Sequence, residues 1–389
     1  MKRIRVIVCP HELVMGGSQI NAIELAGKLK QRGHDVVVFA PPGQLSGRVA
    51  ELGLELVASP DGTRMSWGWM RELGRLAKDW KADIVHTYEW APSLGAAWRL
   101  LPFTGTRVVM TVLSMDVPDF LPKHVPLIVG TKALHHQSGR RSAPVHLMEP
   151  PIDTEQNSHG ALPSSQIKHD GLVISMVCRI TDELDKAEGI LQAIYAVAGL
   201  SRDRRLQLII AGDGEAMQKI RVATREVNEQ FDREVVRLVG TLFDPRAVYD
   251  QSDISLGMGS SALKALSFAK PLIVQGSGGY WKTLTPETLT EFEWQGFYGQ
   301  GGGGAEALAT CLARLCDDAP LRERLGIWGR SLVEEKYSLR NATVSLERIY
   351  FQTLAANTRR GVGSACMTRS AYDFGKFLLA KRIRSGVSP

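Results

Sequence analysis

The sequence predicts two consecutive α/β domains, each a doubly wound parallel sheet covered by helices. Short apolar runs alternate with helical patterns along most of the chain, which is typical of parallel strands joined by crossover helices. The 389 residues suit two domains of about 100–200 residues each. One polar segment, Thr154 to Asp170, interrupts the alternation and is the expected linker. We therefore expect domains at 1–160 and 161–340, a crossover helix at 341–358 and a basic tail at 359–389.

The first half contains one clear amphipathic helix, from about Gly17 to Arg32. Its apolar stripe has the spacing i, i+3, i+4, i+7 and consists of Ala22, Leu25, Ala26 and Leu29. Gly33 supplies a helix stop. The expected strands of this half are Ile4–Cys9, Asp35–Phe39, Leu54–Ala58, Ile84–Thr87, Arg107–Val112, Leu127–Val129 and Val145–Leu147.

The second half repeats the alternation. Its expected strands are Leu172–Cys178, Leu206–Ala211, Val235–Val239, Ile254–Leu256 and Pro271–Gln275. Its expected helices are Gly189–Leu200, Ala216–Gln230, Ala262–Ala269, Ala305–Cys316, Leu321–Lys336 and Asn341–Leu354. The glycine run from Gln300 to Gly304 is interpreted as a mobile linker with little chemistry.

Charge is concentrated at the carboxyl end. The net charge is +6, and the segment from Arg359 to Pro389 carries seven basic residues and one acid, so it holds the whole excess. A neutral body argues against nucleic-acid binding. The tail is either a short basic amphipathic helix that contacts anionic lipid headgroups or a disordered solubilising segment.

Two further classes are disfavoured by the sequence. No apolar run reaches the ~20 residues of a membrane-spanning helix, and the start does not resemble a signal peptide, so a cytoplasmic location is expected by default. The five cysteines are scattered without a C-x-x-C pair, which argues against a metal or disulfide framework.

Ligands of doubly wound sheets bind at the carboxyl ends of the strands, where four loops stand out. Gly16-Gly17 precedes a helix and is either an anion-binding loop or a tight turn. Arg179 and Lys186 suit a diphosphate, although neighbouring acids could pair with them. The segment Gly257 to Leu263 opens a helix whose N–H groups could bind a second phosphate. The turn Gly212-Asp213-Gly214 is interpreted as structural.

Taken in order, these segments resemble the glycosyl transferases group one family, which are retaining enzymes of the GT-B fold. The resemblance runs from about Arg3 to Leu354. It is carried by Gly16-Gly17, Pro150-Pro151-Ile152-Asp153, Val177-Cys178-Arg179 with Lys186 and Gly189, Ile210-Ala211-Gly212-Asp213-Gly214-Glu215, Leu238-Val239-Gly240, Ser252-Asp253 and Leu263-Lys264-Ala265-Leu266 with Lys270-Pro271-Leu272-Ile273.

The resemblance implies two domains facing a cleft and a nucleoside-diphosphate sugar, UDP-linked, as donor. Arg179 and Lys186 would hold the diphosphate, and Gly16 and Gly17 would abut it. Gly240 and Thr241 would meet the base. The remaining donor-binding candidates open one helix: Gly259, Ser260, Ser261, Ala262, Leu263 and Lys264. The cations and the helix N-terminus would stabilise the leaving diphosphate. No metal or other cofactor is expected, and the sequence has no D-x-D motif.

The chain departs from the family pattern at three positions. Lys264 replaces a glutamate that accepts hydrogen bonds from the ribose, Leu256 stands eight positions earlier in place of a second glutamate, and no histidine follows Arg107–Val112. These departures motivate a second hypothesis, a non-catalytic GT-B protein that binds a sugar nucleotide or a partner. A nucleotide-sugar epimerase on the same fold is a third.

The acceptor is expected to be a hydroxyl of a natural product or of a cell-envelope glycan or lipid. Three acids in the loops of the first domain are acceptor-side candidates: Glu12, Glu89 and Asp116. They either line an acceptor site that favours a cationic acceptor or are solvated surface acids.

Overall fold

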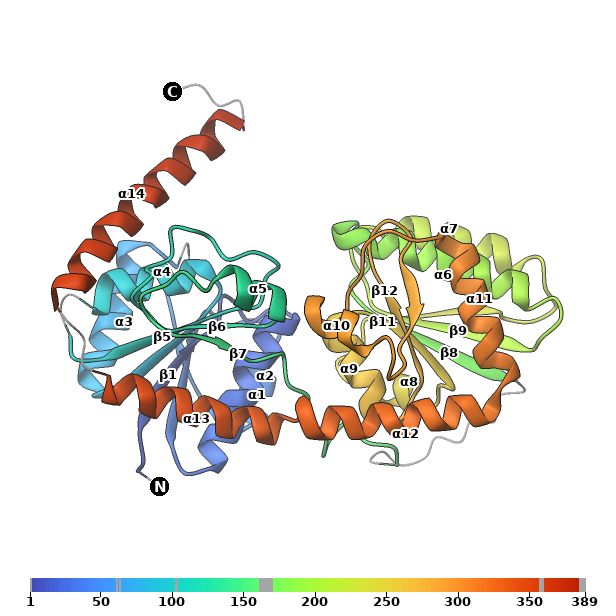
Figure 1. The fold of residues 1–389 in the computed structure, drawn as a ribbon, viewed down its shortest axis with the longest axis horizontal. Coiled ribbons are helices and arrows are strands. Elements are labelled where there is room, and N and C mark those ends of the chain that lie inside the picture. The colour runs from blue at the N-terminus through green and yellow to red at the C-terminus, as the bar shows by residue number, and fades with distance from the viewer. Residues whose placement is uncertain are drawn as a thin grey trace. The chain divides into compact units, whose positions relative to one another are not determined.

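The structure is a computed structural model that describes residues 2–384 except 61, 63, 102–103, 161–170 and 357–359. It comprises two compact units, Met1–Pro151 with Leu339–Pro389, and Ile152–Ser338 (Figure 1). The sequence had suggested boundaries at 160 and 340. Most of the linker expected at Thr154 to Asp170 lies outside the described residues.

The first unit contains a seven-stranded sheet of order β3-β2-β1-β4-β5-β6-β7. Every neighbouring pair is parallel. Its strands, each predicted to within one residue, are β1 (Arg5–Cys9), β2 (Asp35–Ala40), β3 (Glu55–Ala58), β4 (Ile84–Tyr88), β5 (Arg107–Val112), β6 (Leu127–Val129) and β7 (Val145–Leu147). The central strands are almost wholly buried because helices cover both faces of the parallel sheet.

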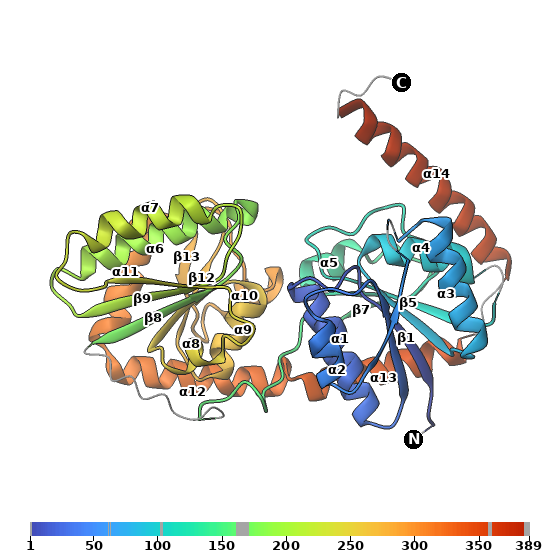
Figure 2. The same ribbon diagram turned by 180° about the vertical axis from the view of Figure 1, so that it is seen from behind.

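Helices pack on both faces of this sheet (Figure 2). One face is covered by α1 (Gly17–Gln31), α2 (Ser46–Glu51) and α13 (Leu339–Ala355). The other is covered by α3 (Trp67–Asp79), α4 (Trp90–Leu100) and α5 (Lys132–Gln137). Gly33 ends α1 with a φ of +94°, as its position predicted.

Two polar contacts attach α13 to the first unit. Buried His86 on β4 lies 2.7 Å from the Tyr350 hydroxyl and 2.7 Å from Thr111 Oγ1. Burial lowers the pKa of His86 to about 3, so the ring is neutral near pH 7. Glu347 of α13 accepts hydrogen bonds from Arg32 Nε at 2.6 Å and Nη2 at 2.8 Å, and lies 3.0 Å from His34 Nε2.

The second unit contains a six-stranded sheet of order β10-β9-β8-β11-β12-β13. Its strands are β8 (Leu172–Val177), β9 (Leu206–Ala211), β10 (Val236–Gly240), β11 (Ile254–Gly257), β12 (Leu272–Gln275) and β13 (Trp281–Thr283). The last pair is antiparallel and the others are parallel. β13 was not predicted, because three residues give no readable alternation.

The helices of the second unit also form two layers. One layer consists of α6 (Lys186–Leu200), α7 (Met217–Asn228) and α11 (Gly304–Asp317). The other consists of α9 (Gly259–Ser267), α10 (Leu289–Gln295) and α12 (Ala319–Lys336). Two short elements complete the unit, the 3₁₀ turn Glu183–Asp185 and α8 (Arg246–Asp250).

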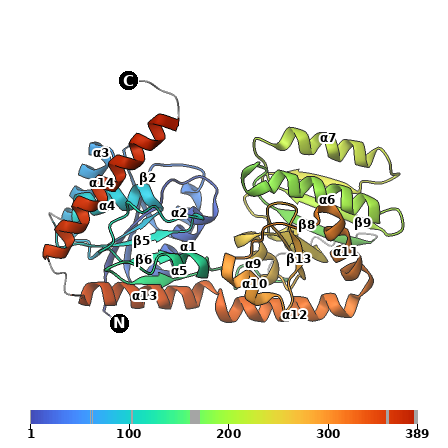
Figure 3. The same ribbon diagram turned by 45° about the horizontal axis from the view of Figure 1, so that its top comes forward.

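The basic tail forms α14 (Arg360–Arg384), which packs on the first unit (Figure 3). The Phe374 ring lies 5.7 Å from that of Trp98 on α4 and 5.2 Å from that of Phe120. Ser370, which is buried, donates a hydrogen bond of 2.6 Å to the Phe120 carbonyl. Within the described residues, no helix combines the length and the apolar character needed to cross a bilayer.

Candidate functional site

Each sheet has one point at which its strand order reverses, between β1 and β4 in the first unit and between β8 and β11 in the second. Ligands of doubly wound folds bind at this switch point, beyond the carboxyl ends of the strands. In the second unit the loops at that place are Cys178 to Asp185, after β8, and Met258, between β11 and α9. Most of the predicted donor-side residues lie in these loops or in the first turns of α6 and α9 that follow them.

Arg179 and Lys186 both lie at the carboxyl end of β8. Arg179 Nη2 is 3.3 Å from Glu183 Oε2, and both side chains are about two-thirds exposed, at 64% and 66%. An exposed pair of this kind is worth only ~0–1 kcal/mol, so the guanidinium can exchange partners readily. The predicted pairing with nearby acids therefore exists, but it does not occupy Arg179 strongly.

Lys186 is the first residue of α6 and is partly buried. Burial lowers the pKa of its ammonium, the charge of Arg179 lowers it further, and Glu183 opposes this with a smaller effect. The nearby charge of Arg179 therefore adds to burial in disfavouring the charged form of Lys186. An anion bound between them would relieve this repulsion.

The backbone before Lys186 is held by residues that sequence reasoning missed. Leu184 and Asp185 both adopt left-handed conformations, with φ of +56° and +54°. Asp185 Oδ2 accepts a hydrogen bond of 2.9 Å from the Gly278 N–H. The buried Gln275 side chain donates to the carbonyls of Asp185 and Lys186 at 3.3 and 3.4 Å. These contacts position Lys186 from β12.

Gly189 makes this arrangement possible. A Cβ at Gly189 would lie 1.8 Å from Gln275 Nε2, so only glycine leaves room for the amide. The Lys186…Gly189 spacing in the sequence reflects this contact.

The turn Gly212-Asp213-Gly214 is structural, as interpreted. A Cβ at Gly212 would lie 1.8 Å from the Cys178 carbonyl oxygen, and one at Gly214 would lie 2.2 Å from that of Ile180. The Gly212 N–H donates to the Gly240 carbonyl at 2.8 Å, which places the end of β10 beside this turn. Gly240 and the exposed Thr241 thus lie at the same edge of the sheet as Arg179.

The N-terminus of α9 is the second predicted phosphate site. The first N–H groups of a helix lack intrahelical partners. The Gly259 N–H donates to the Phe297 carbonyl at 2.9 Å, and Ser261 Oγ donates to the Met258 carbonyl at 2.9 Å. The N–H groups of Ser260 to Leu263 follow in the first turns of α9. Gly259 is therefore engaged within the protein rather than left open to a ligand.

Lys264 lies one turn into α9 and is partly buried. Arg246 forms a fork with Asp244 and is the main cause of the lowered Asp244 pKa, to which the charge of Lys264 adds. Lys264 therefore lies near the loop that follows β10. This is where the sequence expected contacts with the nucleoside.

The glycine run at the end of the unit is not a mobile linker, so that interpretation was wrong. The N–H groups of Gly301, Gly302 and Gly304 donate to the carbonyls of Ser277, Gly278 and Gly279 at 2.8, 3.0 and 2.9 Å. Because Gly278 also bonds to Asp185, the run is connected to the loop that carries Lys186. Local composition gave no sign of this pairing.

In the first unit, two of the three acceptor-side candidates meet the start of α1. Glu89 Oε1 accepts a hydrogen bond of 2.8 Å from Ser18 Oγ, and Glu12 Oε1 accepts one of 3.2 Å from Gln19 Nε2. Both carboxylates therefore flank the Gly16-Gly17 loop at the switch point between β1 and β4. Asp116 lies in the exposed loop after β5, where its carbonyl accepts from Ser114 Oγ at 3.2 Å.

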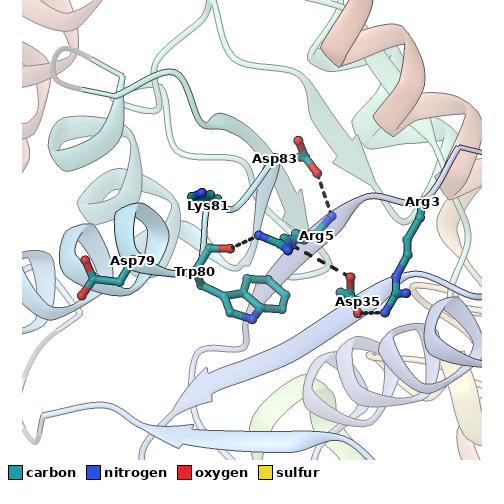
Figure 4. A pocket seen from close by; sticks show the side chains of 7 residues that line it. All are labelled: Arg3, Arg5, Asp35, Asp79, Trp80, Lys81 and Asp83. Atoms are coloured by element: carbon teal, nitrogen blue, oxygen red, sulfur yellow. Dashed lines mark hydrogen bonds and ion pairs between the residues drawn. The ribbon is translucent and has the colours of Figure 1, made fainter.

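A pocket lies at the opposite edge of this sheet, where the strands begin (Figure 4). Its seven lining residues include three cations and three carboxylates: Arg3, Arg5, Asp35, Asp79, Trp80, Lys81 and Asp83. Arg3 pairs with Asp35, and Arg5 Nη1 donates to the Trp80 carbonyl at 3.2 Å. These self-paired charges at the amino ends of strands do not suit a ligand site.

No metal-binding group stands out. Among the described residues, no three His, Cys, Asp or Glu side chains are placed to hold an ion.

Comparison with known proteins agrees with this geometry. Residues 15–135 match the family model described as Glycosyltransferase Family 4. No curated protein matches the sequence.

Solved structures match nearly the whole chain. A glycosyltransferase from Rickettsia africae ESF-5 is 16% identical with a TM-score of 0.74, covering 92% of this chain and 100% of its own. Anabaena Alr3699/HepE in complex with UDP-glucose is 12% identical with a TM-score of 0.71, covering 90% and 100%. WaaG, a glycosyltransferase involved in lipopolysaccharide biosynthesis, is 16% identical with a TM-score of 0.59, covering 87% and 99%.

The fold is therefore GT-B, as the sequence predicted. Residues 15–135, which lie within the first unit, are similar to a glycosyltransferase family.

Proposed function

We propose that this protein transfers a sugar from a UDP-sugar to a hydroxyl acceptor, with retention of configuration and without a metal ion. The observation that carries the proposal is the pair Arg179 and Lys186 at the switch point of the second unit. The solved structure of HepE with UDP-glucose supports UDP as the nucleotide, because its fold is the same.

In the proposed mechanism, negative charge develops on the leaving diphosphate as the bond to the sugar breaks. Arg179 can grip phosphate oxygens with its planar fork, and Lys186 adds a compact charge. The N–H groups of Ser260 to Leu263 supply fixed partial positive charges from α9. Together these groups perform the stabilisation that a divalent cation performs elsewhere.

The nucleoside would contact Gly240, Thr241 and Lys264. An ammonium donates but does not accept hydrogen bonds, so Lys264 would donate to ribose or phosphate oxygens, whereas a carboxylate accepts from the ribose hydroxyls. The acceptor would be a natural product or a cell-envelope glycan or lipid, and Glu12, Glu89 and Asp116 would lie on its side. The cytoplasmic location remains a prediction from the sequence.

A nucleotide thermal-shift screen tests the donor assignment. A ligand at 100 times its dissociation constant stabilises the fold by about 2.7 kcal/mol. We expect UDP and a UDP-sugar to raise the melting temperature more than GDP, ADP or TDP. The same titration on Lys264→Ala should show weaker UDP binding, and an unchanged affinity would remove Lys264 from the site. No response of the native protein to any nucleotide would contradict the proposal.

The alternative is a GT-B protein that binds a sugar nucleotide without transferring the sugar. Lys264 and Leu256, which stand where the family has glutamates, favour it. Stoichiometric UDP binding with no UDP release in the presence of a broad acceptor panel would establish this alternative. Conversion of the UDP-sugar to an isomer without any acceptor would instead indicate an epimerase.

We also propose that α14 contacts an anionic membrane surface. Its exposed side chains combine apolar and basic character: Tyr372, Lys376, Leu378, Leu379 and Lys381. Lys376 Nζ lies 4.6 Å from the centre of the Tyr372 ring. Each basic residue near an anionic surface is worth about 1 kcal/mol.

Vesicle co-sedimentation tests this contact. We expect binding to vesicles containing phosphatidylglycerol to exceed binding to pure phosphatidylcholine, and the double variant Lys376→Glu/Lys381→Glu to lose about tenfold or more. Lys219→Glu, an exposed change in the second unit, is the control. Equal binding to both vesicle types would contradict the proposal.

A further inference from the structure

Glu89 connects three loops at the switch point of the first unit. It follows β4, and its Oε1 accepts hydrogen bonds from Ser18 Oγ at 2.8 Å and from the Leu113 N–H at 3.1 Å. Ser18 follows Gly16 and Gly17 at the start of α1, and Leu113 follows β5. One carboxylate therefore sets the distance between the loops of β1, β4 and β5.

The backbone of Glu89 is in a conformation that glutamate rarely adopts. Its φ is +68° and its ψ is 169°. A positive φ with an extended ψ is a region that essentially only glycine occupies. By contrast, Leu184 and Asp185 combine positive φ with ψ of 30° and 29°, which is the milder left-handed helical region. The fold therefore holds the Glu89 backbone in place against a steric cost.

Despite that steric cost, a glutamate rather than a glycine stands at this position. Glycine would satisfy the backbone without strain, but it would supply no acceptor for Ser18 and Leu113. Strained residues of this kind concentrate at functional sites, where the surrounding structure determines their conformation. Both hydrogen bonds to Glu89 use Oε1, and the described residues provide no partner for Oε2.

Other polar groups beside this loop also lack partners. His11 Nδ1, in the β1–α1 loop, and Asn21 Nδ2, one turn after Ser18, are buried without a hydrogen bond from the described residues. Asn21 as a whole is 5% exposed. Buried polar groups are normally satisfied, so unsatisfied ones indicate an absent water or ligand. Both atoms belong to the β1–α1 segment that Glu89 Oε1 contacts through Ser18.

We propose that Glu89 is the substrate-positioning residue of the first unit. Its Oε1 holds the Gly16–Ser18 loop, and its Oε2 accepts a hydrogen bond from a hydroxyl of the acceptor. This deepens the proposed function, on which it rests, by assigning the acceptor a hydroxyl donor at the β1–β4 switch point. No bond to Glu89 forms or breaks during transfer.

Four variants test the proposal, with UDP-glucose as the donor probe, the broad acceptor panel as the source of the hydroxyl, and UDP release as the readout. Glu89→Gln keeps the shape and the Oε1 acceptor but replaces the second acceptor, Oε2, by an NH2 donor. Glu89→Ala and Glu89→Gly remove the carboxylate, and only glycine also relieves the backbone. Lys81→Gly, at a positive φ of +52° on the amino side of the sheet, is the matched control.

We expect Glu89→Gln to reduce UDP release by about tenfold or more while its UDP dissociation constant stays within about twofold of native. Glu89→Gly should unfold at a higher urea concentration than Glu89→Ala, although both lose UDP release equally. Lys81→Gly should release UDP at the native rate.

The outcomes separate this proposal from the function on which it rests. If the native protein binds UDP and releases UDP from UDP-glucose, and Glu89→Gln is equally active, only the role of Glu89 is overturned. If Glu89→Gln loses UDP release only to the extent that its urea unfolding midpoint is lowered, Glu89 has a structural role. This outcome would also overturn the proposal. Native protein that neither binds UDP nor releases it would overturn the proposed function and this inference together.

Discussion

Replacing Lys186 by alanine is expected to reduce sugar transfer by about tenfold or more, which is ~1.4 kcal/mol or more of transition-state stabilisation. The reason is electrostatic. Lys186 is partly buried at the end of β8, where its charge acts through less water than that of a surface lysine. Arg179→Ala should have a similar effect, because the two cations would share one diphosphate. UDP release from UDP-glucose under saturating donor measures both.

The control for these two variants is Arg204→Ala. Arg204 is also an arginine of the second unit, but it precedes β9 and pairs with Asp317 at 2.8 Å, away from the carboxyl ends of the strands. Its removal should leave the rate unchanged. Rates equal to native in both Lys186→Ala and Arg179→Ala would remove the phosphate assignment. Lys186→Arg should recover part of the rate, since it restores the charge with a different shape.

Replacing Glu347 by alanine is expected to lower the free energy of unfolding by about 3 kcal/mol. Glu347 is 2% exposed and accepts from Arg32, whose side chain is about one-third exposed, and from buried His34, so its removal leaves both donors without their acceptor. Desolvation raises the Glu347 pKa, but the hydrogen bonds from Arg32 and His34 outweigh it and the net pKa is lowered. The carboxylate is therefore ionised above pH 5 and its contribution fades as the pH falls through the lowered value.

Urea unfolding followed by the fluorescence of the first unit measures this loss. The matched control is Glu51→Ala, an exposed glutamate that pairs with Arg48 at 3.1 Å and should cost less than about 0.5 kcal/mol. A Glu347→Ala midpoint equal to that of Glu51→Ala would show that α13 is held by its apolar face alone. That face includes Leu346, Ile349 and Tyr350.

Much of the fold could be predicted because parallel strands carry their burial in the sequence. β2 is Asp-Val-Val-Val-Phe-Ala, a continuous apolar run that is typical of a strand buried on both faces and not of a helix or an exposed strand. The end of each run then located the loops, so Arg179 and Lys186 could be assigned to one strand end before any contact was known. Their roles in donor binding remain predictions.

Tertiary structure alone decided how distant segments support that strand end. The bonds from Gln275 to the Asp185 and Lys186 carbonyls and from the Gly278 N–H to the Asp185 carboxylate join residues about ninety positions apart. Local propensity contains no information on such pairs. The same holds for the pairing of Gly278 with Gly302, which composition suggested was a linker.

The sequence by itself determined two parallel-sheet units, their loops and the cations at the end of β8, because burial and charge are properties of residue type. The sequence also predicted a crossover helix at 341–358. Only the tertiary structure decided that contacts of His86 and Glu347 hold α13 on the first unit, and that Glu89 adopts a glycine-like backbone. Glutamate does not favour that conformation in any local context. Its φ is set by the hydrogen bonds of three converging loops, and these exist only after the sheet has formed.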